Sequence, residues 1–171
     1  AKQGEDAIKI IPDGAVELYY DNVLKFYTTS LGTTFLGDTH TVQGTFRPSV
    51  NNNYNLGSSS YRWATIYASN SLNTSDRTQK NTIVESDLGL DFVNKLKPVS
   101  YKWNKDDSKT HYGLIAQDVE EAVISSGKRL EDFGAVDKPI DATMGLAYNE
   151  IISPLIKAVQ EQQKQIEELK Q

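Results

Sequence analysis

The sequence predicts a mixed fold in three parts: an N-terminal all-β segment of an oligomeric stalk, a small α+β domain, and a C-terminal helix that forms a short coiled coil. Three observations lead to this prediction. Short strand patterns separated by turn residues fill the N-terminal part, helical periodicity begins after Ser75, and an apolar heptad pattern ends the chain. We place the three parts at residues 1–74, 75–148 and 149–171.

Composition narrows the possible functions. The 171 residues are 38% hydrophobic, enough for a core, but a mean hydropathy of −0.51 indicates a large surface. A net charge of −5 argues against nucleic acid and anionic membrane partners, which require a clustered basic face. The sequence has no cysteine, and its two histidines, His40 and His111, are too few for an ordinary transition-metal site. We therefore expect no metal and no cofactor. The sequence has no membrane-spanning or signal-type segment, and because it starts at Ala1 rather than Met, we expect a C-terminal fragment of a longer protein.

The first part reads as short strands at residues 7–11, 15–20 and 23–28, separated by turn residues at 12–14, 20–22 and 30–32. Each strand carries few large apolar residues, so we expect neighbouring chains to supply the missing core. A loop-like stretch at 47–60 precedes a further strand pattern at 61–68. We expect the aromatic rings of Trp63 and Tyr67 in that pattern to pack against other side chains. The alternative is that they form a platform on which a sugar ring stacks.

The second part begins its helical pattern at Ser86-Asp87, which we expect to cap a helix that ends before Pro98. A hairpin follows, with alternation from Val99 to Trp103, a polar turn at 106–108 and a second strand at 111–116. Gln117-Asp118 then opens a second helix. Its inward residues would be Val119, Ala122 and Val123, and Gly127 would end it in a left-handed conformation.

The C-terminal part has an apolar seam with alternating steps of three and four. Its members are Ile152, Leu155, Val159, Gln162, Ile166 and Leu169. This is the pattern of a coiled coil of under three heptads, and the pattern leaves the number of chains open. The alternative is a single amphipathic helix that packs on its own domain.

The one candidate catalytic site in the sequence lies at the boundary between the first and second parts, at Ser75. Ser75 and Lys80 could form a dyad in which a neutral lysine amine takes the serine proton and the hydroxyl attacks a carbonyl carbon. The spacing is weak evidence, because Ser100 and Lys105 have the same separation. Residues five apart do not share a helix face, so contact requires an extended or looped Ser75 with Lys80 curling back. Otherwise Ser75-Asp76 is a helix cap, with Asp76 and Gln79 as a capping-box pair.

Four segments of the sequence resemble one known family. They are Ser75-Asp76-Arg77-Thr78-Gln79-Lys80, Val99 to Trp103, His111 to Val119, and Ile156 to Gln162. In this order they are similar to the C-terminal intramolecular chaperone of bacteriophage tail spikes, tail fibres and neck appendages, of the endosialidase type. The stretches 14–22 and 54–63 resemble stalk segments that commonly precede that domain, so the resemblance spans the chain.

The resemblance implies a folding device that removes itself. Three chains would assemble through the C-terminal domain, making the stalk and the coil trimeric, and a single-turnover serine endopeptidase would then cut Thr74-Ser75. Ser75 matches the family's nucleophile and Lys80 its base, while Asp76, His111, Gln117 and Asp118 would play supporting roles. The stalk would stay in the virion tail, where the parent fibre binds the host surface, and the chaperone would be released in the host cytoplasm during assembly.

Lys80 must lose its proton near neutral pH to serve as a base. Lowering an amine pKa from about 10.4 to roughly 7 takes about 4 to 5 kcal/mol of differential destabilisation of the charged form. We therefore expect burial at an assembled interface to activate Lys80. His111 is a candidate oxyanion donor. Two other functions remain open: a non-cleaving carbohydrate-binding tip that uses Tyr61, Trp63 and Tyr67, and a purely structural trimerisation module.

Overall fold

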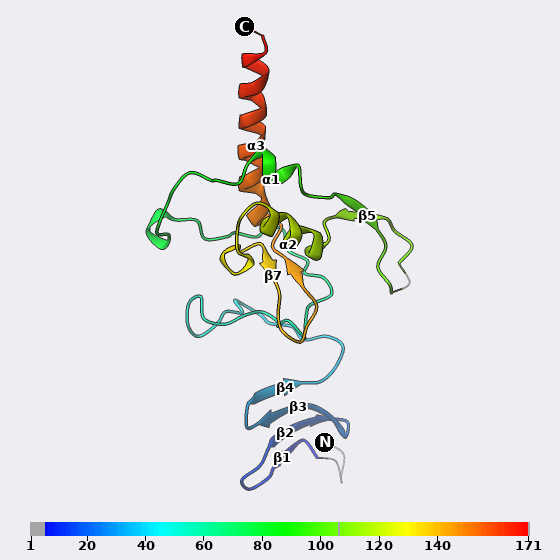
Figure 1. Cartoon of the computed structure of the whole chain (residues 1–171). Helices are drawn as coiled ribbons and strands as arrows, with labels where there is room; N and C mark the ends of the chain where they lie inside the picture. The colour runs from blue at the N-terminus through cyan, green and yellow to red at the C-terminus, as the bar shows by residue number, and fades with distance from the viewer. Residues whose placement is uncertain (1–5, 106, 171) are drawn as a thin grey trace. The chain divides into compact units, whose positions relative to one another are not determined.

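The computed structural model describes residues 6–105 and 107–170, and the chain divides into two compact units, Ala1–Tyr54 and Asn55–Gln171. Asp106, in the expected hairpin turn, lies outside the described residues. The architecture is a mixture of small antiparallel sheets and helices with a long helix at the C-terminus (Figure 1). This mixed α+β class agrees with the sequence prediction.

The first unit is one antiparallel sheet in the order β1, β2, β3, β4 (Figure 1). Its strands are β1 (Ile8–Ile10), β2 (Val16–Tyr20), β3 (Val23–Thr29) and β4 (Gly32–Phe35). The first three lie where the sequence predicts strands, and β4 was not predicted. Asp21 and Asn22 have φ of 52° and 61°, so a two-residue turn with positive φ at both positions joins β2 to β3.

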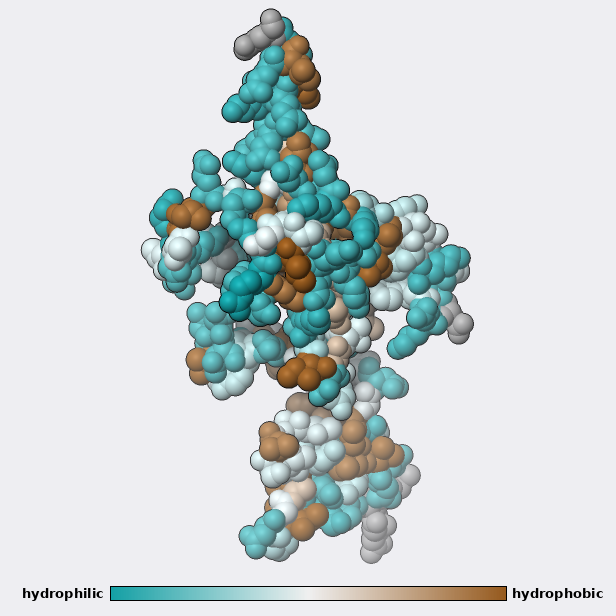
Figure 2. All heavy atoms as spheres, in the orientation of Figure 1, coloured by the Kyte–Doolittle hydropathy of each residue, from teal (hydrophilic) through white to brown (hydrophobic). Residues whose placement is uncertain are grey.

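The single chain buries little of this sheet, as its short strands led us to expect. Among residues 6–54 no side chain is fully buried, and the best apolar contact is the edge-on pair of Phe26 and Phe35, with ring centroids 5.1 Å apart. Ile8, Ile10 and Tyr20 are largely exposed. Apolar surface of the sheet is therefore visible in the space-filling view (Figure 2).

The stretch before Ser75 does not form the strand expected at residues 61–68. It is irregular there, and Tyr61, Trp63 and Tyr67 are exposed. A strand needs a hydrogen-bonded neighbour, and the described residues of this chain offer none at that stretch. The β-type composition was read correctly, but composition alone does not provide a pairing partner.

The first helix of the second unit is shorter than predicted and is capped differently. It is α1 (Leu90–Val93), with Gly89 rather than Ser86 or Asp87 at its N-cap position. The Ser86 hydroxyl accepts from the backbone N–H of Leu88 in a local turn, and Asp87 pairs with Lys128. The expected apolar residues still face inward, because Phe92 is buried and the others pack against it: Leu88, Val93 and Leu96.

The predicted hairpin and second helix are both present. In the hairpin β5 (Val99–Tyr101) pairs with β6 (His111–Gly113), with Tyr101 opposite His111. The helix is α2 (Ala116–Ser125), which begins one residue earlier than predicted, with Ile115 at the N-cap. Asp118 therefore lies in its first turn and is not its cap. Gly127 has φ of 75° and ends the helix as expected.

The core of the second unit surrounds α2. Phe92, Val119, Ala122 and Val123 form the buried cluster, against which residues from later segments pack: Phe133, Val136 and Leu146. These segments are a 3-10 turn, η2 (Leu130–Asp132), and the pair β7 (Val136–Asp137) and β8 (Gly145–Leu146). None of the three was predicted from the sequence, because each is too short to show a period.

The C-terminal helix α3 (Asn149–Glu168) has two apolar faces. One face packs against α1 and buries Ile151, Pro154 and Ala158. The other is the heptad seam, which stays exposed at Ile152, Leu155, Val159, Gln162, Ile166 and Leu169. Helix α3 therefore packs on its own domain with one face and exposes the heptad seam on another. No helix in the described part of the chain is long and apolar enough to cross a membrane.

Candidate functional site

Ser75 and Lys80 are brought together by one turn of 3-10 helix, η1 (Arg77–Gln79). The residues on either side of the turn are extended, Asp76 at φ −66° and ψ 138° and Lys80 at φ −123° and ψ 149°. The chain therefore reverses direction between them, and the Lys80 ammonium donates to the Ser75 Oγ at 2.9 Å. This is the looped geometry that the five-residue spacing required.

Asp76 holds this turn in place rather than contacting the lysine. Its carboxylate accepts from the Thr78 hydroxyl at 2.7 Å and from the Thr78 backbone N–H at 2.8 Å. The hydroxyl bond and then the N–H bond lower the pKa of the Asp76 carboxyl, partly opposed by desolvation. The expected cap at Asp76 is confirmed, but its side-chain partner is Thr78, and Gln79 gives no reciprocal bond among the described contacts.

The second pair with the same spacing does not make this contact. Ser100 lies in β5, whose extended backbone carries the chain away from it toward Lys105. Within the described residues no hydrogen bond joins Ser100 to Lys105. The local turn, not the spacing, therefore distinguishes Ser75 and Lys80.

The Ser75–Lys80 pair is fully open to solvent in the single chain, since every residue from 71 to 85 is exposed. The isolated chain therefore has the contact that a dyad needs but does not bury the Lys80 side chain.

His111 lies at a different place in the second unit. Its Nε2 is 2.6 Å from the Asp107 carboxylate, and its ring stacks on Tyr101 with centroids 5.6 Å apart. Trp103 packs beside both rings. Within the described part of the chain, the hydrogen-bond partner of His111 is Asp107 and not Ser75 or Lys80. One chain thus does not bring the predicted oxyanion donor to the predicted nucleophile.

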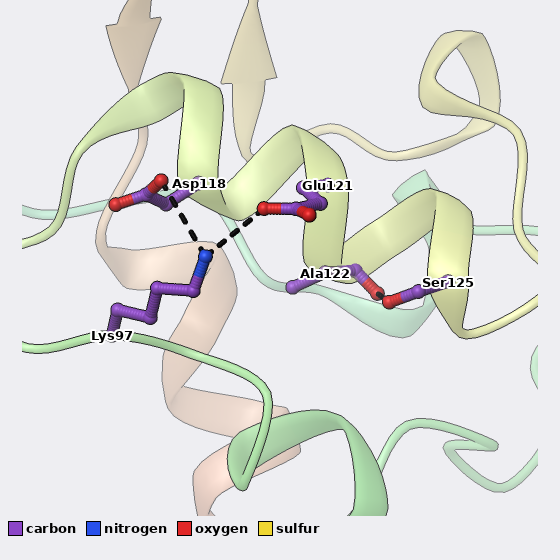
Figure 3. A network of polar contacts seen from close by, with 5 residues as sticks. All are labelled: Lys97, Asp118, Glu121, Ala122 and Ser125. Atoms are coloured by element: carbon purple, nitrogen blue, oxygen red, sulfur yellow. Dashed lines mark hydrogen bonds and ion pairs between the residues drawn. The ribbon is translucent and has the colours of Figure 1, made fainter.

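Gln117 and Asp118 lie in the first turn of α2, where Gln117 is exposed. Asp118 and Glu121 both face Lys97, at 3.8 Å and 3.0 Å (Figure 3). The hydrogen bond to Glu121 is the main cause that raises the pKa of Lys97, followed by the charges of Glu121 and Asp118. This network ties α2 to the segment before β5, which is a structural role on this chain.

Sequence reasoning missed the residues that anchor the chain just after Lys80. The Glu161 carboxylate on α3 accepts from the backbone N–H of Leu90 at 2.7 Å, and Lys157 on the same helix lies 3.6 Å from Glu85. Helix α3 therefore holds the stretch 85–90 with one face while its heptad seam faces solvent. Both residues lie within the motif at 156–162, but no local pattern links them to residues 85–90.

The described residues contain no group of three or more metal-ligating side chains that could hold a metal ion. What the geometry offers is a hydroxyl, an amine and the peptide bond that precedes the hydroxyl. That set suits acyl transfer at the Thr74-Ser75 bond.

Comparison with known proteins shows that the segment containing Ser75 and Lys80 is similar to a known family. Residues 75–128 match the family model described as "Chaperone of endosialidase", and the match begins at Ser75. This segment of the chain is similar to the domains of that family. The resemblance found in the sequence is thus confirmed for this segment, which includes Lys80, His111 and the helix α2.

A solved structure shares the fold of this segment and of the residues before it. It is the carboxy-terminal domain of the bacteriophage T5 L-shaped tail fiber with its intra-molecular chaperone domain. The TM-score is 0.58 at 19% identity, covering 90% of this chain and 44% of that chain. The chain thus spans less than half of the solved structure, and the likeness shows the fold. No curated protein matches the sequence.

Proposed function

We propose that residues 75–171 form an intramolecular chaperone that assembles three chains of a phage tail fibre or spike, folds the β segment before it and then cuts the Thr74-Ser75 bond. The family match at 75–128 and the fold shared with a tail-fibre chaperone domain support the chaperone role. The hydrogen bond of 2.9 Å between Lys80 Nζ and Ser75 Oγ supports the cut. This contact is the observation on which the proposed chemistry rests.

In the proposed reaction neutral Lys80 takes the Ser75 hydroxyl proton while Oγ attacks the Thr74 carbonyl carbon. The carbon–nitrogen bond then breaks, and the Lys80 ammonium returns the proton to the Ser75 nitrogen. The resulting ester is hydrolysed by water, leaving a carboxylate at Thr74 and a free hydroxyl and amine at Ser75. Attack within one chain is an N-to-O acyl shift, and attack between chains is an acyl-enzyme route; both use the same two residues.

Assembly is the proposed trigger. Lys80 is exposed in one chain, so packing of the chains must desolvate it before it can act as a base. The exposed heptad seam of α3 is the surface proposed to bring three chains together, and the opposite face of α3 holds residues 85–90 through Lys157 and Glu161. Association of three α3 helices through the seam would therefore also fix residues 85–90, which follow Ser75 and Lys80 in the sequence. An isolated monomer that cut itself as fast as the trimer would contradict this trigger.

The test is intact-mass analysis with light scattering on the purified chain and four variants. Wild type is expected to yield two products, residues 1–74 and 75–171. Ser75→Ala and Lys80→Arg are expected to stay intact yet assemble, because arginine keeps its proton. Ser100→Ala and Lys105→Ala are matched controls with the same spacing and should cut normally.

Cleavage of Ser75→Ala at the same bond would reject the proposed nucleophile. A wild-type chain that stays intact as a trimer after long incubation would instead favour a structural trimerisation module or a carbohydrate-binding tip.

A further inference from the structure

A compact turn lies on the N-terminal side of the proposed cut, at residues 57–63. The Ser58 N–H donates to the Tyr61 carbonyl at 2.9 Å, and the Tyr61 N–H donates to the Ser58 hydroxyl at 3.0 Å. Gly57 has φ of +88°, and a Cβ there would lie 2.9 Å from the Tyr61 carbonyl oxygen and 3.4 Å from a ring carbon of Trp63. The turn thus closes on itself, requires glycine, and fixes the position of the next residue, Arg62.

Arg62 reaches from this turn to the other side of the proposed cut. Its guanidinium donates to the backbone carbonyl of Thr143, 81 residues later, in the loop that joins β7 to β8. The two segments together line one surface pocket, with Ser59, Ser60 and Arg62 on one side and Asp141, Ala142 and Thr143 on the other. A guanidinium bonded to the backbone of a loop 81 residues away is a built contact between two distant segments.

We propose that the turn at 57–63 is the docking element that keeps the chaperone on the stalk after the Thr74-Ser75 bond is cut, with Arg62 as its anchor. The partner of the turn is the β7–β8 loop of this same chain sequence. This inference rests on the proposed function, because only cleavage turns the contact from an internal one into an interface. Release of the chaperone is then a separate step that the Arg62 contact controls.

The number and strength of the Arg62 contacts determine how much their loss speeds the release of the chaperone. A hydrogen bond from a charged donor contributes enough that its loss is expected to speed separation about tenfold or more per contact. In an assembly each chain contributes one such contact, so the contacts act together and hold more strongly than one alone.

The first experiment uses the full chain after self-cleavage. Size-exclusion chromatography at intervals measures how long residues 75–171 co-elute with residues 1–74. In wild type the two products are expected to stay together, and in Arg62→Ala they are expected to separate at least about tenfold faster with an unchanged cutting rate. Arg47→Ala is the matched control: it removes the same charge, but among the described residues the hydrogen-bond partner of Arg47 is the carbonyl of the adjacent Pro48. Equal retention in both variants would overturn the proposal.

The second experiment does not need cleavage. In a Ser75→Ala chain, hydrogen exchange is measured for the amides of residues 140–144 with and without Arg62→Ala. Loss of the anchor is expected to raise exchange in this loop and leave α2 unchanged. Unaltered exchange in the loop would overturn the docking contact. A wild-type chain that never cuts, together with this rise in the Ser75→Ala chain, would instead reject the proposed protease and keep the Arg62 contact.

Discussion

Glu161 on α3 caps the first turn of α1 although 71 residues separate it from its partner, the backbone N–H of Leu90. The bond is 2.7 Å long and partly buried. The first N–H groups of a helix have no partner within the helix, so a carboxylate satisfies both the free donors and the positive end of the helix. One side chain of the C-terminal helix thereby fixes the start of the core of the second unit.

Replacing Glu161 by alanine is expected to lower the free energy of unfolding by about 1 to 2 kcal/mol, since a charged acceptor is lost and a donor is left partly buried. Glu161→Gln keeps an acceptor and is expected to cost about half as much. Urea unfolding at a fixed chain concentration measures both, with exposed Gln160→Ala as the control. Equal stability of wild type and Glu161→Ala would show that the bond contributes nothing.

Gly89→Ala is expected to act through the same bond. A Cβ at Gly89 would lie 2.6 Å from Glu161 Oε1, so the carboxylate must move away and its bond to Leu90 is lost. The substitution should therefore cost about as much as Glu161→Ala in wild type, about 1 to 2 kcal/mol, and little in a chain that already carries Glu161→Ala. Simple additivity in this double-mutant cycle would disprove the steric link.

Local patterns predicted the parts of the fold that depend on neighbours in sequence. The turn at Asp21-Asn22, the hairpin that pairs Tyr101 with His111, and the buried face of α2 all follow from residues a few positions apart. The strands β7 and β8 are two residues long each and show no period. The cap of α1 was misread because its partner Glu161 comes from a different helix.

The candidate site was predictable only in part for the same reason. Asp76 as a cap follows from sequence, and that cap forms the turn that brings Lys80 to Ser75. The sequence also placed His111 near the nucleophile by resemblance, yet on one chain its hydrogen-bond partner is Asp107. Contacts that depend on the assembly of chains cannot be read from the periodicity of a single one.

The tip of the hairpin is expected to open in acid. The backbone N–H of Lys109 is the main cause that lowers the pKa of the Asp107 carboxyl, with a smaller effect from His111. A carboxyl whose folded pKa lies below its unfolded value near 4 stabilises the fold above about pH 4, and this contribution is lost as the pH falls through the folded pKa. The protection of the amides of residues 111–113 from hydrogen exchange, relative to their intrinsic exchange rates at each pH, should therefore fall on acidification below about pH 4.

Asp107→Asn should remove this acid-dependent step, because the amide does not titrate, whereas Ser108→Ala should keep it. Carbon NMR of the side chain gives the direct check. A carboxyl pKa of Asp107 at or above the ordinary value near 4 would contradict the expected sign.

The heptad seam is best tested by single substitutions. Deleting residues 160–171 is expected to impair assembly, but that deletion also removes Glu161 and its cap on α1. Loss of the trimer in such a chain would then have two causes. Two adjacent residues of α3 separate these causes, since Val159 is 57% exposed on the seam and Ala158 is 2% exposed on the face that packs on α1.

Val159→Glu is expected to reduce the mass in light scattering to that of one chain and to leave the circular dichroism of the domain unchanged, because in a single chain that position faces water. Self-cleavage should fall with it if assembly activates Lys80. Ala158→Glu should instead unfold the domain, since a charge placed in this buried contact without a partner costs several kcal/mol. A Val159→Glu chain that still forms the wild-type oligomer would show that the seam is not the assembly surface, and the trigger proposed for Lys80 would then have to come from contacts elsewhere in the chain.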